Sequence, residues 1–349
     1  MISAIKTAGQ FLDQPLLVAK FKKAVPGIMV AGAAAFDADK IHKAPKENKK
    51  KTAINTTAVL TATVASALAA PKMAAKVVGK EYDKYCIKDI KANNKKIVDN
   101  FLSNEKVSDG VNNILQKAKD KVLNYKEIKT LRNEIGQTDS GDKFIKKLIP
   151  EPENVTAHDI RKEIGRLSLI GLIPVAGGVA GGIAGEKMSE GKITKKKLGD
   201  KVKEGTYQYL ANIFLCNIGA GLALAGLEKA NIKSKSARAL GMVGGIVATG
   251  IVGGSAIANF IGKHLINPIF DGKKPKEEKK KEGLNSERKP EIIDICLHTD
   301  DIATVAVMSG LKWIEPALPI LYGISGYRAG IGYRNGNKNK ADKTDKTKK

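Results

Sequence analysis

The chain has 349 residues and a net charge of +24 at pH 7, with 42% hydrophobic, 28% charged and 5% aromatic residues. Only seven of its 60 cationic residues are Arg, so groups for base stacking and for bidentate base contacts are scarce. We therefore expect no nucleic-acid partner. The lysines instead suit contact with the anionic headgroups of a lipid bilayer.

Charge is separated from apolar sequence along the chain. Four stretches of 19 to 24 residues contain no Asp, Glu, Lys, Arg or His. Each is close to the roughly 20 apolar residues that cross the hydrocarbon core of a bilayer. The sequence thus predicts four membrane spans, at 52–71, 167–185, 205–227 and 239–262.

The first part of the chain, residues 1–51, is an amphipathic and then apolar segment that ends in a basic linker. Its apolar run at 24–36 follows two lysines, as in a secretory signal, but the 23 residues before it are too many for such a signal. We expect an uncleaved helical hairpin or an interfacial helix here. Residues 52–79 would hold the first membrane helix, although their many Thr and Ala residues make its insertion marginal.

Residues 80–166 are predicted to be a charged helical module facing water. Apolar side chains recur there at helical spacing, and Thr156 with Asp159 has the spacing of a capping box at a helix start. The face is formed by Val111, Ile114, Leu115, Ala118 and Val122.

Glycine-rich membrane helices are predicted over 167–262, joined by a Lys-rich loop at 186–204 and a short loop at 228–238. A disordered linker at 263–291 follows, and 337–349 would be a disordered tail. Between them, 292–336 would form interfacial or partly inserted helices. Trp313, Tyr322, Tyr327 and Tyr333 would form an interfacial aromatic belt there.

The glycines of the second span recur every four residues. Gly177, Gly181 and Gly185 form GxxxGxxxG, and the same spacing recurs more weakly at 241–254. Residues four apart share a helix face, and a face of glycines lets helices pack closely in lipid. Residues 171–185 and 241–254 thus resemble the glycine-zipper class of membrane segments, which defines a mode of packing rather than a function. The expected helix-packing residues are Gly177, Gly178, Gly181, Gly182, Gly185, Gly241, Gly245, Gly250 and Gly254.

Motifs that bear chemistry are weak. Residues 214–231 contain Gly-x-Gly but have Leu224 where a dinucleotide-binding turn needs a small residue. The segment at 296–301 gathers Cys, His and two Asp, which fits a capped helix start better than a metal site. We expect no catalytic residues, no cofactor and no metal, and the sequence identifies no small-molecule substrate.

The sequence therefore predicts an all-α fold: a glycine-rich transmembrane helical bundle with a charged helical module and a disordered tail. We expect a non-enzymatic, multi-pass integral membrane protein that assembles through glycine-zipper packing, with homo-oligomers left open. Two alternatives remain, a pore-forming or membrane-perturbing protein and a soluble Gly/Ala-rich helical interaction protein. The distribution of Lys and Arg places both termini on the cytoplasmic side.

Overall fold

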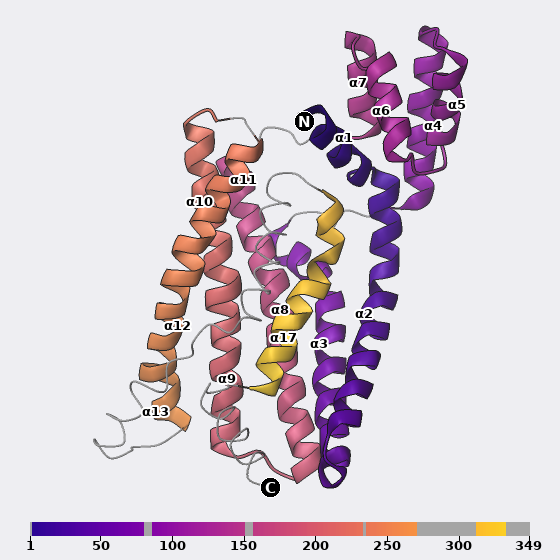
Figure 1. The fold of residues 1–349 in the computed structure, drawn as a ribbon. Coiled ribbons are helices and arrows are strands. Elements are labelled where there is room, and N and C mark those ends of the chain that lie inside the picture. Colours follow the sequence, from indigo (N-terminus) through magenta and orange to yellow (C-terminus); the bar gives the residue numbers. More distant parts are fainter. Residues whose placement is uncertain (1, 80–85, 151–155, 233–234, 271–311, 333–349) are drawn as a thin grey trace, which may run out of the picture. The chain divides into compact units, whose positions relative to one another are not determined.

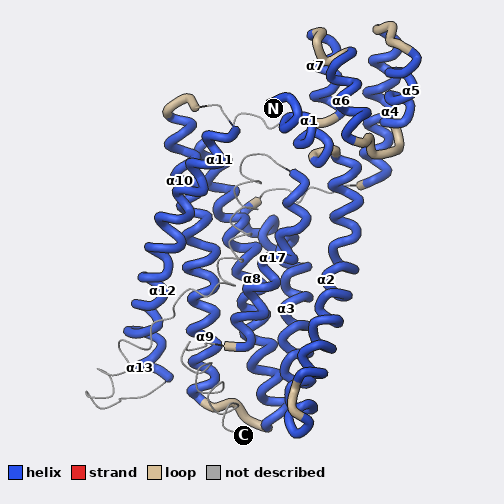
Figure 2. Tube along the Cα trace, in the orientation of Figure 1, coloured by secondary structure: helices blue, strands red, loops and turns tan. Residues whose placement is uncertain are grey.

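The computed structural model describes residues 2–79, 86–150, 156–232, 235–270 and 312–332. Within these ranges the fold is all-α, and no strand is present (Figure 2). The chain divides into two compact units. Unit 1 comprises 1–27, 82–154 and 306–317, and unit 2 comprises 28–81, 155–305 and 318–349. The predicted tail at 337–349 and the Cys/His/Asp segment at 296–301 lie outside the described residues, as does most of the predicted linker at 263–291.

Unit 1 is built from short amphipathic helices. They are α1 (Ile2–Leu12), the start of α2 (Pro15–Lys43), α4 (Ile87–Asn104), α5 (Asp109–Ala118), α6 (Tyr125–Glu134) and α7 (Asp139–Leu148), with the 3₁₀ helix η5 (Lys312–Ala317). Side chains cap three of them at the N-terminus. Ser108 and Thr138 cap α5 and α7, and Asn124 and Glu127 form a capping box on α6.

The core of unit 1 contains four of the five residues of the face predicted from helical spacing; the fifth, Val122, follows the end of α5 and is not in this core. Val111, Leu115 and Ala118 are buried, Ile114 is partly buried, and Phe101 stacks on Phe144 with ring centroids 4.2 Å apart. Gln14 fastens the start of α2 to the α5–α6 turn. Its amide accepts from the backbone N–H of Leu123 at 2.7 Å and donates to the Leu123 carbonyl at 2.8 Å.

Unit 2 is a bundle of long helices (Figure 1). Residues 28–43 of α2 lead through the 3₁₀ turn η1 (Lys46–Asn48) into α3 (Lys49–Val78), and α8 (Ala157–Glu190) follows the module. The next helix contains α9 (Lys195–Tyr209), the π-helical turn η2 (Leu210–Phe214) and α10 (Leu215–Lys229). The last long helix contains α11 (Lys235–Ile246), η3 (Val247–Gly254), α12 (Ser255–Ile261), η4 (Gly262–Ile266) and α13 (Asn267–Phe270). The short α17 (Leu318–Ile331) completes the unit.

Four described helices are long and apolar enough to cross a membrane, at 46–78, 157–190, 195–229 and 240–270. Each contains or largely overlaps one predicted span. The span at 52–71, the weakest by composition, lies inside the first of them.

Consecutive long helices run in opposite directions, so their ends meet. At one end, Glu190 of α8 pairs with Lys51 of α3 and with Lys197 of α9, and Phe270 of α13 packs on Gly199. At the other end, Gly165 of α8 lies beside Val78. We call the first the basic end, because it carries Lys49, Lys50, Lys51, Lys187, Lys192, Lys195, Lys196 and Lys197.

Several predicted boundaries are wrong. The Lys-rich loop of 186–204 is helical except at 191–194, and the linker predicted from 263 is helical to Phe270. The capping box at Thr156 and Asp159 is confirmed. Because the helix it starts continues unbroken to Glu190, however, 157–166 belongs to a membrane-length helix and not to the module. The apolar run at 24–36 likewise lies inside a single helix, α2, and makes no hairpin by itself.

Helix α17 lies in the segment predicted to be interfacial or partly inserted, but its side chains are more buried than those of a helix on a surface. Eight of the 14 residues of α17 are buried, against α3, α8 and α9. Tyr322 is 1% exposed and lies beside Gly171, so it belongs to the core and not to an aromatic belt. Tyr327 contacts Phe36 of α2 edge to face. At 1.5 Å per residue α17 is about 21 Å long, which is too short to cross the bilayer.

Candidate functional site

One register of α8 glycines faces α3. A β-carbon placed on Gly181 would lie 2.7 Å from the carbonyl oxygen of Ala58 and 2.7 Å from the β-carbon of Ala62. One placed on Gly185 would lie 3.0 Å from the α-carbon of Asn55. Gly177 meets Ser66 in the same way, even more closely. The absence of side chains at these three positions lets the two helices approach at backbone contact.

The neighbouring register of the same helix faces α17. A β-carbon on Gly178 would overlap the carbonyl group of Gly326, and one on Gly182 would overlap that of Gly330. The contact is reciprocal, because a β-carbon on Gly326 would overlap the carbonyl group of Pro174. The two glycine registers of α8 therefore receive two different helices of the same chain.

The weaker glycine series lies on α11 and η3 and faces α10 and η2. Gly245 packs on Gly219, with each glycine lying against the other's carbonyl group. A β-carbon on Gly254 would lie 2.8 Å from the α-carbon of Ala211. All four predicted glycines of this series contact the helix formed by α9, η2 and α10: Gly241 at Leu227, Gly245 at Gly219, Gly250 at Cys216 and Gly254 at Ala211.

A second feature, missed at the sequence level, is a buried polar ladder along α9 and η2. Glu204, Gln208 and Asn212 are 2%, 0% and 4% exposed. The Gln208 amide donates to the Glu204 carboxylate at 2.8 Å, and the Asn212 amide donates to the Gln208 carbonyl at 3.0 Å. These hydrogen bonds join residues of one helix, so they do not hold two helices together. Burying such polar groups within a membrane-length helix costs free energy, and in membrane proteins such groups often line a path for ions, protons or substrates.

The ladder is extended at both ends by contacts to other helices. Lys201, 4% exposed, donates from Nζ to the Gly330 carbonyl of α17 at 2.7 Å. Asn217 donates to the Ser168 hydroxyl of α8 at 3.3 Å. From Lys201 to Asn217 the ladder covers 16 residues, or about 24 Å of helix.

The π-helical turn η2 keeps Asn217 in line with the ladder. Lys201, Glu204, Gln208 and Asn212 recur at three and four residues, the spacing of one α-helical face. Asn217 comes five residues after Asn212, which a π-turn accommodates because it adds one residue to the helical turn. The spacing of the first four was visible in the sequence, but Glu204 lies just before the uncharged stretch at 205–227.

A buried ion pair lies near the start of α8. Arg166 and Glu163, each 7% exposed, approach to 2.5 Å between Nη2 and Oε1. At the opposite end of α8, Glu186 and Glu190 both accept from Lys197 at 2.6 Å. Glu163 and Glu204 therefore place buried acidic side chains in two of the membrane-length helices, although the uncharged stretches of the sequence contain none.

Unit 1 has a polar groove of about 800 Å³ between α4 and α7. Phe101 and Phe144 form its apolar floor, and Lys96, Lys143 and Lys147 lie on its rim. Asp139 also lines the groove and pairs with Lys143 at 2.6 Å, so part of the positive charge is balanced locally.

The two sequence motifs with possible chemistry, at 214–231 and 296–301, form no catalytic or metal site among the described residues. Residues 215–229 form α10, with a helical turn and not a strand before them, so the dinucleotide-binding arrangement is absent there. No group of three His, Cys, Asp or Glu side chains able to hold a metal occurs in the described ranges. Residues 296–301 lie outside them.

The chain matches no protein-family model, no curated protein and no solved structure.

Proposed function

We propose that the protein is a non-enzymatic, multi-pass membrane protein whose glycine faces assemble the helices of a single chain. The observation that carries the proposal is the pair of registers on α8. Gly177, Gly181 and Gly185 receive α3, while Gly178 and Gly182 receive α17.

A membrane environment is the one in which this arrangement is favourable. Glycine in a water-facing helix costs about 1 kcal/mol relative to alanine. In lipid, by contrast, close backbone approach supplies the van der Waals contact that drives helices together. Large apolar side chains also remain exposed on the outside of the bundle, among them Leu222 at 64%, Leu240 at 74% and Phe260 at 60%. These exposures suit contact with acyl chains.

The test is extraction of membranes at alkaline pH after expression of the full chain. The proposal predicts that the protein stays in the pellet and enters solution only with detergent. A monodisperse protein recovered without detergent would refute it and would favour the soluble helical alternative.

The glycine contacts also bear on assembly. The predicted zipper residues are occupied by helices of the same chain, so substitutions there should disturb folding of the single chain before any association of copies. We therefore expect that a substitution which leaves the fold of the single chain intact also leaves crosslinking between chains unchanged.

A second candidate function, passage of protons or small cations, is favoured by the buried ladder of Glu204, Gln208 and Asn212. In reconstituted vesicles containing a pH-sensitive dye, the wild-type chain should dissipate a pH or cation gradient, and Gln208→Leu should abolish this. Asn259→Leu, at a half-buried polar position on α12, is the matched control. Equal leak in vesicles with and without protein would refute conduction. Release of a large entrapped dye would indicate the pore-forming alternative.

A further inference from the structure

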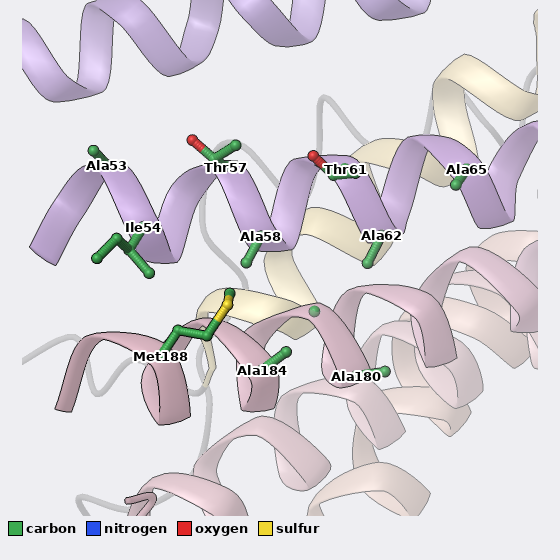
Figure 3. A pocket seen from close by; sticks show the side chains of 11 residues that line it. Ala53, Ile54, Thr57, Ala58, Thr61, Ala62, Ala65, Ala180, Ala184 and Met188 are labelled. Atoms are coloured by element: carbon green, nitrogen blue, oxygen red, sulfur yellow. The ribbon is translucent and has the colours of Figure 1, made fainter. Parts of the chain in front are cut away.

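The outer surface of unit 2 has an elongated groove between α3 and α8, with a volume of about 760 Å³ (Figure 3). Small side chains line it: Ala53, Thr57, Thr61 and Ala65 from α3, and Ala180 and Ala184 from α8. Ile54, Ala58 and Ala62 point from α3 toward α8, and Met188 points from α8 toward α3 beside Ile54 (Figure 3). The close glycine packing of the two helices leaves this groove narrow and almost wholly apolar.

The groove has the length of one leaflet. From Ala53 to Ala65 it covers 12 residues of α3, or about 18 Å at 1.5 Å per residue. Half of a hydrocarbon core of roughly 30 Å is about 15 Å. A helix from a second copy would be expected to follow α3 and α8 across the whole bilayer. A groove confined to one leaflet matches a single acyl chain better.

Positive charge gathers where the groove reaches the basic end. Lys50 precedes Ala53 and Ile54 by three and four residues, and Lys187 follows Ala184 by three, so both lysines lie on the groove faces of their helices. Both are exposed. The N-terminus of α3 lies beside them, and the side chain of its N-cap, Asn48, makes no capping hydrogen bond. The helix dipole adds partial positive charge at this end of α3.

Glu47, on η1 three residues before Lys50, is exposed, whereas the other acidic groups of this region are engaged. Glu186 and Glu190 accept from Lys197, and Glu190 also pairs with Lys51. Asp37 of α2 accepts from the Thr57 hydroxyl at 2.6 Å, on the groove wall about 10 Å along α3 from Lys50. Lys50 and Lys187 are thus left to attract an anion at the mouth of an apolar groove.

We propose that this groove binds one anionic glycerophospholipid, with an acyl chain between α3 and α8 and the phosphate beside Lys50 and Lys187. The inference rests on the proposed membrane function and names one specific lipid partner within it. Attraction of juxtamembrane lysines to anionic lipid corresponds to about a fivefold change in affinity for each residue, so about thirtyfold for two.

The experiment measures lipid binding by the purified full chain in a neutral detergent, using native mass spectrometry. Phosphatidylglycerol is titrated against phosphatidylcholine of the same acyl composition. We expect one phosphatidylglycerol to bind preferentially. The double variant Lys50→Gln/Lys187→Gln should weaken its binding by about thirtyfold. Lys72→Gln/Lys76→Gln, which removes the same charge from exposed positions at the other end of α3, should leave it unchanged.

The acyl-chain part of the site has its own pair of variants. Thr61→Leu/Ala184→Leu fills the groove from both walls at exposed positions and should abolish preferential binding. Ala69→Leu/Ala176→Leu places the same leucines at exposed positions outside the groove and should not.

Three results would overturn the lipid site. They are equal binding of the two lipids, equal loss in the lysine variants and their control, and a dimer that the groove-filling variant dissociates. All variants are also extracted at alkaline pH. Absence of lipid preference in the wild-type chain with membrane retention intact refutes the site alone, whereas release of the wild-type chain from the membrane refutes the proposed function.

Discussion

Replacing Gly178 with alanine tests the close packing of α8 and α17 by the smallest possible change. The added β-carbon would overlap the carbonyl group of Gly326. Because the obstacle is backbone, no side-chain rotation can relieve it, and the two helices must move apart. Gly244→Ala is the matched control. Gly244 lies in a helix with no heavy atom within 4 Å of the added carbon.

The expected magnitude follows from two opposing terms. Overpacking of a tight interface costs about 1–3 kcal/mol. Alanine in place of glycine favours the helix by up to about 1 kcal/mol. The second term is common to both variants, so their free energies of unfolding should differ by about 1–3 kcal/mol, with Gly244→Ala the more stable. Gly178→Leu should destabilise further, because the larger side chain needs a wider separation.

The assay is reversible unfolding of the purified chain in mixed micelles by increasing SDS, followed by circular dichroism. Two further substitutions extend the comparison. Gly182→Ala, which faces Gly330, should behave like Gly178→Ala, and Gly226→Ala, with open space around it, should behave like Gly244→Ala. Equal stability changes in all four variants would show that backbone contact does not hold α17 in place.

Three further pairs of variants test other parts of the structure. Glu163→Ala should destabilise the bundle by about 3–5 kcal/mol because it leaves Arg166 buried without this partner, and Glu163→Leu/Arg166→Met should recover most of that loss in the same SDS titration. Gly191, with φ of 75°, ends α8 in the left-handed region, so Gly191→Leu should cost about 1–2 kcal/mol and Gly191→Asn clearly less. Leu115→Ala should destabilise unit 1 by about 2–5 kcal/mol, measured by hydrogen exchange of α5 and α6, while Lys126→Ala, at an exposed position on α6, should change little.

The Gly191 prediction corrects an expectation from the sequence. The sequence places Gly191 in the Lys-rich loop predicted at 186–204, where a leucine would be tolerated. The structure gives it a positive φ at the end of a helix, where a leucine is strained. Spacing alone does not distinguish a glycine needed for its backbone angle from one in an open loop.

Helical periodicity and uncharged length were enough to place the four long apolar helices, though not their ends. The four spans and the α5 face depend on local sequence, as does the capping box at Thr156, and the structure has the helices where these patterns predict them. The position of α17 depends on contacts between residues about 150 apart, such as Gly178 with Gly326. No local pattern carries that information, and Lys312 and Glu315 nearby favoured a surface position.

The polar ladder illustrates a different limit. Glu204 follows Lys201 and Lys203 in a lysine-rich segment, so counting charges assigns it to a solvated loop. Its burial depends on α9 continuing the apolar helix and packing against α8 and α17, where Ala329 and Val179 approach Gly205. Three- and four-residue spacing of Lys201, Glu204, Gln208 and Asn212 is the sequence signal that could have identified this face.

The membrane topology tests the account most directly. In a chain with Cys86, Cys216 and Cys296 replaced by alanine, single cysteines at positions 45, 120 and 195 are labelled with an impermeant reagent in sealed vesicles. Position 45 precedes α3 and position 195 begins α9, at the basic end, whereas position 120 belongs to the segment between α3 and α8. Four spans predict that 45 and 195 react from one side and 120 from the other. Reaction of 45 and 120 from the same side would contradict the account, because α3 would then not cross the membrane.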